Sequence, residues 1–127
     1  MAIIMPAKQL IVKKQQIVDD TEMQQLNAAY RRKDRPTDVL AFAMREGDGA
    51  HLHPEVLGDV VISLDTAARQ AADRGAPLAD EVRLLLTHGV LHLLGYDHER
   101  SPADARRMFA RQRALVRRLT TEDAEVR

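Results

Sequence analysis

A single stretch, residues 84–98 with the sequence LLLTHGVLHLLGYDH, constrains this chain more than any other feature. It contains three histidines, His88, His92 and His98, and a glycine, Gly95, lies between the last two. Residues four apart lie on the same face of a helix, so His88 and His92 can bind one ion. Glycine permits a sharp turn after the helix, which would return His98 to that ion. The spacing therefore predicts a metal site with three imidazole ligands.

Three histidines without an evident fourth ligand match a catalytic zinc site, which keeps one position for water or substrate. The chain has no cysteine, so any metal must be held by nitrogen and oxygen ligands, and no disulfide can form. We predict one Zn²⁺ per chain, and nickel, copper and iron remain compatible with the same ligands. The alternative is three unrelated histidines, two of them buried in an apolar helix. That arrangement is costly unless each has a hydrogen-bond partner.

Position 89 separates this chain from zinc proteases with similar spacing. Zincins have the pattern His-Glu-x-x-His, and metzincins add a glycine and a third histidine at the spacing found in this chain. Gly89 occupies the position of the glutamate that activates water in those proteases. A metzincin-like zinc peptidase is therefore an alternative function that lacks its general base.

The remaining sequence alternates between strand and helix patterns. Strands are predicted within residues 8–18, at 39–44 and at 57–63, and the apolar run 39–44 suits a strand buried on both faces. Helices are predicted after Asp19 and before Pro36, from an Asp65 cap to Gly75, from about residue 77 to 94, and from Ser101 onward. The last helix has an inner stripe whose one polar member is Gln112: Ala105, Met108, Phe109, Gln112, Leu115, Val116 and Leu119. We predict a single domain, 1–127, with a frayed tail at 120–127.

Composition and charge exclude some functions. The formal net charge is zero, which argues against a generally basic nucleic-acid-binding surface, although residues 100–118 hold seven arginines against Asp104 alone.

Aromatic residues make up only 3 %, so the core must be aliphatic. The apolar start, residues 1–5, is too short for a signal peptide, and no run is long enough to span a membrane. A cytoplasmic protein is therefore expected.

Three blocks of sequence resemble the YbeY family of bacterial metal-dependent endoribonucleases. The most specific is HGVLHLLGYDH at residues 88–98. The others are LNxxYR at 26–31 followed by PTDVL at 36–40, and LGDVVIS at 57–63. They occur in the family's order and cover most of residues 19–119. Two features depart from the family pattern: Ala41-Phe42-Ala43 stands where the family usually has Ser-Phe-Pro, and residues 1–16 match poorly.

The resemblance implies an α+β fold, with a small mixed sheet packed with several helices and a central helix carrying two of the histidines. It implies a zinc-dependent endoribonuclease specific for single-stranded RNA, with ribosomal RNA and the small ribosomal subunit as partners. Its roles would be maturation of the 16S rRNA 3′ end and ribosome quality control. DNA and membranes are not expected partners, and the oligomeric state is not indicated. A non-catalytic ribosome-assembly factor with a structural zinc is the second alternative.

The resemblance also adds candidate residues outside the histidine run. Arg31 falls where the family has a functional arginine, and its guanidinium would hold a phosphate and stabilise charge during cleavage. The alternative is an arginine that only interacts with a helix end. We therefore predict Arg31 and His88 as catalytic, with His88, His92 and His98 as metal ligands.

Several other polar residues have less defined roles. Asp97 either orients a ligand imidazole or stabilises a turn, and Asp59 either approaches the site or is a strand-edge carboxylate. Thr37 and Asp38 are expected to order the loop before the strand. The two remaining histidines, His51 and His53, are expected in an exposed loop.

Overall fold

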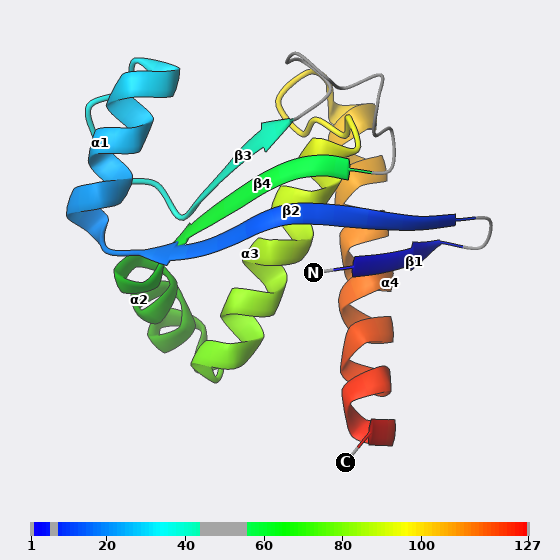
Figure 1. Cartoon of the computed structure of the whole chain (residues 1–127). Coiled ribbons are helices and arrows are strands. Elements are labelled where there is room, and N and C mark those ends of the chain that lie inside the picture. The colour runs from blue at the N-terminus through cyan, green and yellow to red at the C-terminus, as the bar shows by residue number, and fades with distance from the viewer. Residues whose placement is uncertain (1, 6–7, 44–55, 127) are drawn as a thin grey trace.

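The computed structural model describes residues 2–5, 8–43 and 56–126 (Figure 1). The elements occur in the order β1 (Ala2–Met5), β2 (Lys8–Val18), α1 (Asp20–Arg31), β3 (Val39–Ala43), β4 (Val56–Ser63), α2 (Leu64–Arg74), α3 (Leu78–Leu93) and α4 (Pro102–Val126). This confirms the predicted α+β fold with a small mixed sheet. The predicted loop with His51 and His53, and the end of the predicted strand at Met44, lie outside the described residues.

The four strands are arranged in the order β1-β2-β4-β3. β2 and β4 pair in parallel, whereas β1 pairs with β2 and β3 pairs with β4 in antiparallel fashion. Side chains alternate between the two faces of a strand, and β4 follows this rule. Val60 and Ile62 face a cluster with α2 and α3, whereas Val61 faces a smaller cluster with Met23 of α1. The sheet is therefore covered by α1 on one face and by α2 and α3 on the other (Figure 1).

The prediction that the strand at 39–44 is buried on both faces was wrong. β3 forms an edge of the sheet, and Leu40 is its one buried residue. The other four side chains are half-buried. An apolar run of this length does not distinguish an edge strand from a central strand, because the order of strands is a tertiary property. As an edge strand, β3 is able to form part of an open cleft.

Local capping fixes where α1 and α2 begin. Asp19 caps α1 as predicted, since its Oδ1 accepts a hydrogen bond from the Glu22 amide at 2.8 Å. The N-cap of α2 is Ser63, not Asp65 as predicted. β4 runs as far as Ser63, so the helix begins two residues earlier, and Asp65 instead accepts a hydrogen bond from the Asp20 amide at 3.0 Å. Gly75 ends α2 as predicted, at φ +65°.

The central helix α3 packs closely on the sheet at Gly89. A Cβ atom at this position would lie 2.8 Å from Cγ1 of Val60 and 3.2 Å from Cγ2 of Val39. α3 ends at Leu93 near the predicted bound, and Gly95 follows with φ +98°. α4 begins at Pro102 and extends to Val126, so it includes most of the segment predicted to fray. None of the helices in the described ranges has the length and apolarity that a membrane crossing requires.

Candidate metal centre

The three histidines of the 84–98 run converge. Each offers one ring nitrogen, and these three atoms lie within 4.8 Å of one another. Nε2 of His88 and Nε2 of His92, one turn apart on α3, are separated by 3.1 Å. After the helix, the chain turns at Gly95, and the Tyr96 amide donates to the Leu91 carbonyl at 3.0 Å. This turn returns His98 to within 5.1 Å of the His88 ring, measured between ring centroids.

The chemistry of this cluster fits a metal ion. Nδ1 of His88 lies 2.7 Å from Oε1 of Gln112, and an amide oxygen only accepts hydrogen bonds. The proton is therefore on Nδ1, which leaves the Nε2 lone pair of His88 directed at the cluster. Nδ1 of His98 is buried and has no hydrogen-bond partner. Unpaired buried nitrogen atoms are costly, and a metal ion would satisfy such an atom by binding its lone pair. The cluster can hold a metal.

Burial keeps His92 in the form that metal binding requires. Desolvation by burial is the main cause that lowers the pKa of His92 below its usual value, and the nearby His88 and His98 lower it further. The carboxylate of Asp97 and a hydrogen bond with the Tyr96 backbone oppose this shift. A lowered pKa favours the neutral imidazole at neutral pH, and only the neutral ring has a lone pair for a metal.

Helix α4 supports the histidines from outside. Gln112 is only 9 % exposed, and it accepts the hydrogen bond from His88 described above. The ring of Phe109 lies against the rings of His88 and His98, with centroid distances of 6.3 and 5.8 Å. In the sequence, Gln112 is the polar member of an otherwise apolar helix stripe, and no role was predicted for it. A polar residue in an apolar stripe was the signal in the sequence that Gln112 has a specific partner. The sequence did not identify His88 as that partner.

A cleft of about 890 Å³ opens on the histidines. One side is formed by α3 and the turn that follows it. The other side is formed by the end of α1, the 37–38 segment and β3. Arg31, from the end of α1, lines this cleft together with all three histidines. Its side chain is exposed, and no ion pair involving it is found among the described residues. The structure thus places all four candidate site residues around one cleft.

Of the remaining candidates, Asp38 and Asp97 have hydrogen-bond partners, whereas Oδ1 of Asp59 is buried without one. Asp38 orders the segment before β3 as expected: its Oδ1 accepts from the Val39 amide at 2.8 Å and its Oδ2 from Nε2 of Gln70 at 3.3 Å. Asp97 accepts a hydrogen bond from the Glu99 amide at 2.8 Å. This bond stabilises the turn, which was one of the two roles expected for Asp97. Asp59 pairs with Phe42 across the β3–β4 ladder, and it is not among the described residues that line the cleft.

Comparison with known proteins gives consistent results. The family model described as "Endoribonuclease YbeY" matches residues 7–120. This match extends into the N-terminal segment, 1–16, that we expected to match poorly. The protein named "Endoribonuclease YbeY" from Syntrophotalea carbinolica is 56 % identical over 84 % of this chain and 71 % of its own length. The protein of the same name from Geobacter sulfurreducens is 52 % identical over 78 % of this chain and 67 % of its own length.

A solved structure is also similar. The solution structure of TM1509 from Thermotoga maritima aligns with a TM-score of 0.61 and 30 % sequence identity. The alignment covers 91 % of this chain and 73 % of that one. The likeness therefore extends over nearly the whole fold and is not confined to the histidine motif.

Proposed function

This chain belongs to the YbeY family of endoribonucleases, and on that premise we propose that it is a zinc-dependent enzyme that cleaves single-stranded RNA. The observation that carries the proposal is the cleft in which Arg31 faces the cluster of His88, His92 and His98. In this proposal the three histidines hold one Zn²⁺. When bound, the metal supplies Lewis acidity toward a phosphate oxygen and toward water.

The protein's own residues prepare the site for a phosphodiester. Gln112 fixes the orientation of the His88 ring and its tautomer through the 2.7 Å hydrogen bond. Arg31 has its guanidinium available to bind a phosphate and to stabilise the charge that develops on it during cleavage. Asp38 connects the segment between Arg31 and β3 to α2, through its hydrogen bond with Gln70. This side of the cleft is thereby held in place relative to the histidines.

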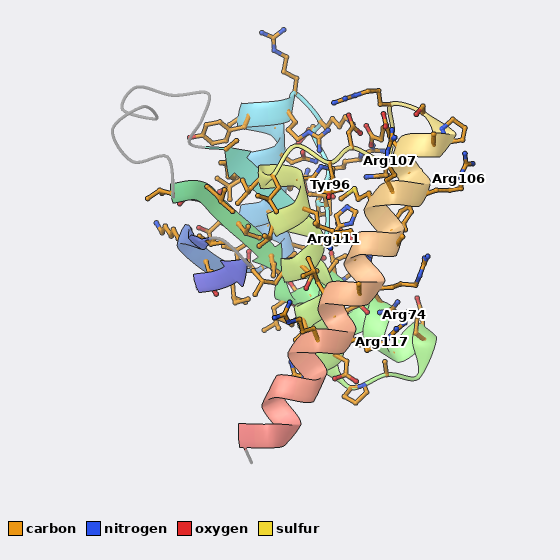
Figure 2. All side chains as sticks on the ribbon, turned by 90° about the vertical axis from the view of Figure 1, so that its right-hand side faces the viewer. Arg74, Tyr96, Arg106, Arg107, Arg111 and Arg117 are labelled. Carbon is orange, nitrogen blue, oxygen red and sulfur yellow. The ribbon has the colours of Figure 1, made fainter. Side chains whose placement is uncertain are left out.

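We further propose that the RNA is ribosomal, at the 3′ end of 16S rRNA in the small subunit, and that the protein acts in the cytoplasm in rRNA maturation and ribosome quality control. The family supports this part of the proposal. Exposed arginines along α4 offer it further support, because they can contact phosphates outside the cleft (Figure 2). Binding that depends on such contacts weakens as salt concentration rises.

The structure weakens the peptidase alternative further. A zincin-type glutamate would stand at position 89, where even a Cβ atom approaches Val60 to 2.8 Å. A glutamate therefore fits only if the Val60 side chain or α3 shifts. The chain also lacks, among its described residues, another group of at least three metal-ligating side chains that would form a second centre.

The test combines metal analysis with RNA and protein cleavage assays. Wild type should contain one zinc per chain and cut single-stranded RNA but not casein. His88→Ala should lose both metal and cleavage, whereas Asp73→Ala, at an exposed position on α2 outside the cleft lining, should retain both. The product ends will distinguish attack by water, which leaves a 5′-phosphate, from attack by the 2′-hydroxyl, which leaves a cyclic phosphate.

Three outcomes would overturn the proposal. Full RNA cleavage by a folded, metal-free His88→Ala variant would remove the metal from the mechanism. Native zinc content without cleavage of any single-stranded RNA would favour an assembly factor with a structural zinc. Cleavage of casein that His88→Ala abolishes would favour the peptidase.

A further inference from the structure

The aromatic residues of this chain are gathered at one place. The sequence contains two tyrosines, two phenylalanines and no tryptophan. Tyr30, Phe42 and Tyr96 line the cleft, and the fourth, Phe109, packs against the histidines. The buried core, among the side chains that the structure describes, consists of valine, leucine, isoleucine, methionine and alanine. Aromatic rings usually contribute large buried areas to a core. In this chain they lie at the cleft, so core packing does not explain their position.

Tyr30 is the most accessible of the large apolar residues in the described part of the chain, with 67 % of its surface exposed. It lies in the last turn of α1, directly before Arg31. Its ring meets the ring of Phe42 edge to face, with centroids 5.1 Å apart and an angle of 72° between the ring planes. Phe42 is half-buried on β3 and supports Tyr30 from one side. Tyr30 therefore lines the cleft with most of its surface accessible.

We propose that Tyr30, supported by Phe42, forms a stacking subsite for an unpaired nucleobase, beside the position at which Arg31 binds phosphate. This inference rests on the proposed function, and it names how the same cleft recognises its substrate. Exposed aromatic rings bind single-stranded nucleic acids by stacking on successive bases. Such stacking tolerates any base, because every base has a π face. The subsite therefore selects for unpaired strands and not for sequence.

The adjacency of Tyr30 and Arg31 gives the subsite its chemical definition. A stacking ring and a cationic guanidinium at neighbouring positions match the two parts of a nucleotide, the flat base and the anionic phosphate. A simple packing role for Tyr30 would account for less, because 67 % of its surface stays exposed. A packing role also predicts that leucine would replace tyrosine without loss, whereas stacking requires an aromatic ring.

The experiment measures binding of an RNA that the protein does not cut. The probe is a hexamer of 2′-O-methyl RNA with phosphorothioate linkages, which resists attack by water and blocks attack by the 2′-hydroxyl. A second probe has the same backbone with base-free sugars. The variants are Tyr30→Ala, Tyr30→Leu and Tyr30→Phe in the full-length, metal-loaded protein. Leu78→Ala, at an exposed apolar residue of α3 outside the cleft, is the matched control. Thermal melting verifies that each variant is folded.

Stacking predicts a specific pattern. Tyr30→Ala and Tyr30→Leu should bind the base-bearing hexamer about 5-fold to 100-fold more weakly than wild type. Tyr30→Phe and Leu78→Ala should bind it as wild type does. On the base-free hexamer, all five proteins should bind equally weakly. A Tyr30→Trp variant would contain the only tryptophan of the chain, and its fluorescence should be quenched by the base-bearing hexamer alone.

Two results would overturn the subsite: full affinity in Tyr30→Leu, or equal losses on both hexamers in Tyr30→Ala. These outcomes are independent of the cleavage assay. If the pattern appears but no RNA is cut, the stacking subsite stands and the proposed function fails. If RNA is cut but base-bearing and base-free hexamers bind alike, the proposed function stands and the subsite fails.

Discussion

The two sides of the cleft are built differently. The histidine wall consists of His88, His92 and His98, which are half-buried and supported by Gln112 and Phe109 of α4. The arginine wall consists of Tyr30, Arg31 and the 37–43 segment, and its first two side chains are exposed. A site for one ion benefits from ligands fixed by packing, because fixed ligands need little reorganisation on binding. A polymer such as RNA needs an accessible surface, and the exposed Tyr30 and Arg31 of the arginine wall supply one.

The largest expected effect tests whether α4 fixes the histidine wall. Gln112→Ala removes the acceptor for Nδ1 of His88, so zinc affinity should fall about 10-fold to 100-fold. Competition with a chromophoric chelator measures this affinity. Gln112→Glu keeps an acceptor and should retain binding, as should Arg113→Ala on the exposed side of α4. Unchanged affinity in Gln112→Ala would show that the histidines are fixed without α4.

The second effect concerns how the histidine wall sits on the sheet. Gly89→Ala places a methyl group against Val60 and should destabilise the protein by about 2 kcal/mol in urea unfolding. Val60→Ala alone leaves a cavity and also destabilises. In the double variant the two changes compensate, so its loss should be smaller than the sum of the single losses. Additive losses would mean that α3 and β4 are not in close contact at this position.

The third effect tests the arginine wall in isolation. Arg31→Lys keeps the positive charge but loses the planar, two-pronged hydrogen bonding, so kcat/KM for RNA cleavage should fall about 10-fold. Zinc content should not change, because the cluster that can hold the metal consists of His88, His92 and His98 and does not include Arg31. Arg35→Lys, at an exposed position outside the cleft lining, is the control. A loss of zinc in Arg31→Lys would show that the two walls are not independent.

The smallest effect concerns the attachment of α1, which carries Tyr30 and Arg31. Hydrogen bonds from Ser63, Thr66 and Arg69 lower the pKa of Asp20 from 3.8 to about 2. The depressed pKa means that the carboxylate stabilises the fold above about pH 4, and that this contribution is lost as the pH falls through about 2. Asp20→Asn should lower the free energy of unfolding by about 1 kcal/mol at pH 6. In urea titrations, the difference from wild type should shrink toward pH 2, and a difference independent of pH would contradict this assignment.

The sequence predicted what depends on neighbours along the chain. The histidine cluster follows from helical spacing and one glycine, so it was predictable from eleven residues, 88–98. The caps at Asp19 and Gly75 were predictable for the same reason. Ser63 and Asp65 are both suitable N-caps, and the choice between them depends on how far β4 extends, which no local pattern specifies.

Contacts between distant elements were not predictable. The pairing of His88 with Gln112 spans 24 positions, and it exists because α4 packs beside α3. The pairing of Tyr30 with Phe42 requires α1 and β3 to be brought together by the sheet. The edge position of β3 has the same origin, since strand order results from the whole sheet. Family resemblance identified Arg31, whereas residue chemistry alone favoured a helix-end role.

The turn at Gly95 has a consequence for the order in which the molecule is assembled. It makes the histidine cluster a local structure, and loops of about ten residues close in roughly 10–100 ns. The arginine wall must wait for the parallel pairing of β2 with β4, whose contacts are far apart in sequence and form slowly. We therefore expect a folding chain to acquire its metal-binding capacity before its RNA surface is complete. An incompletely folded chain would then be able to capture metal but not yet cut RNA.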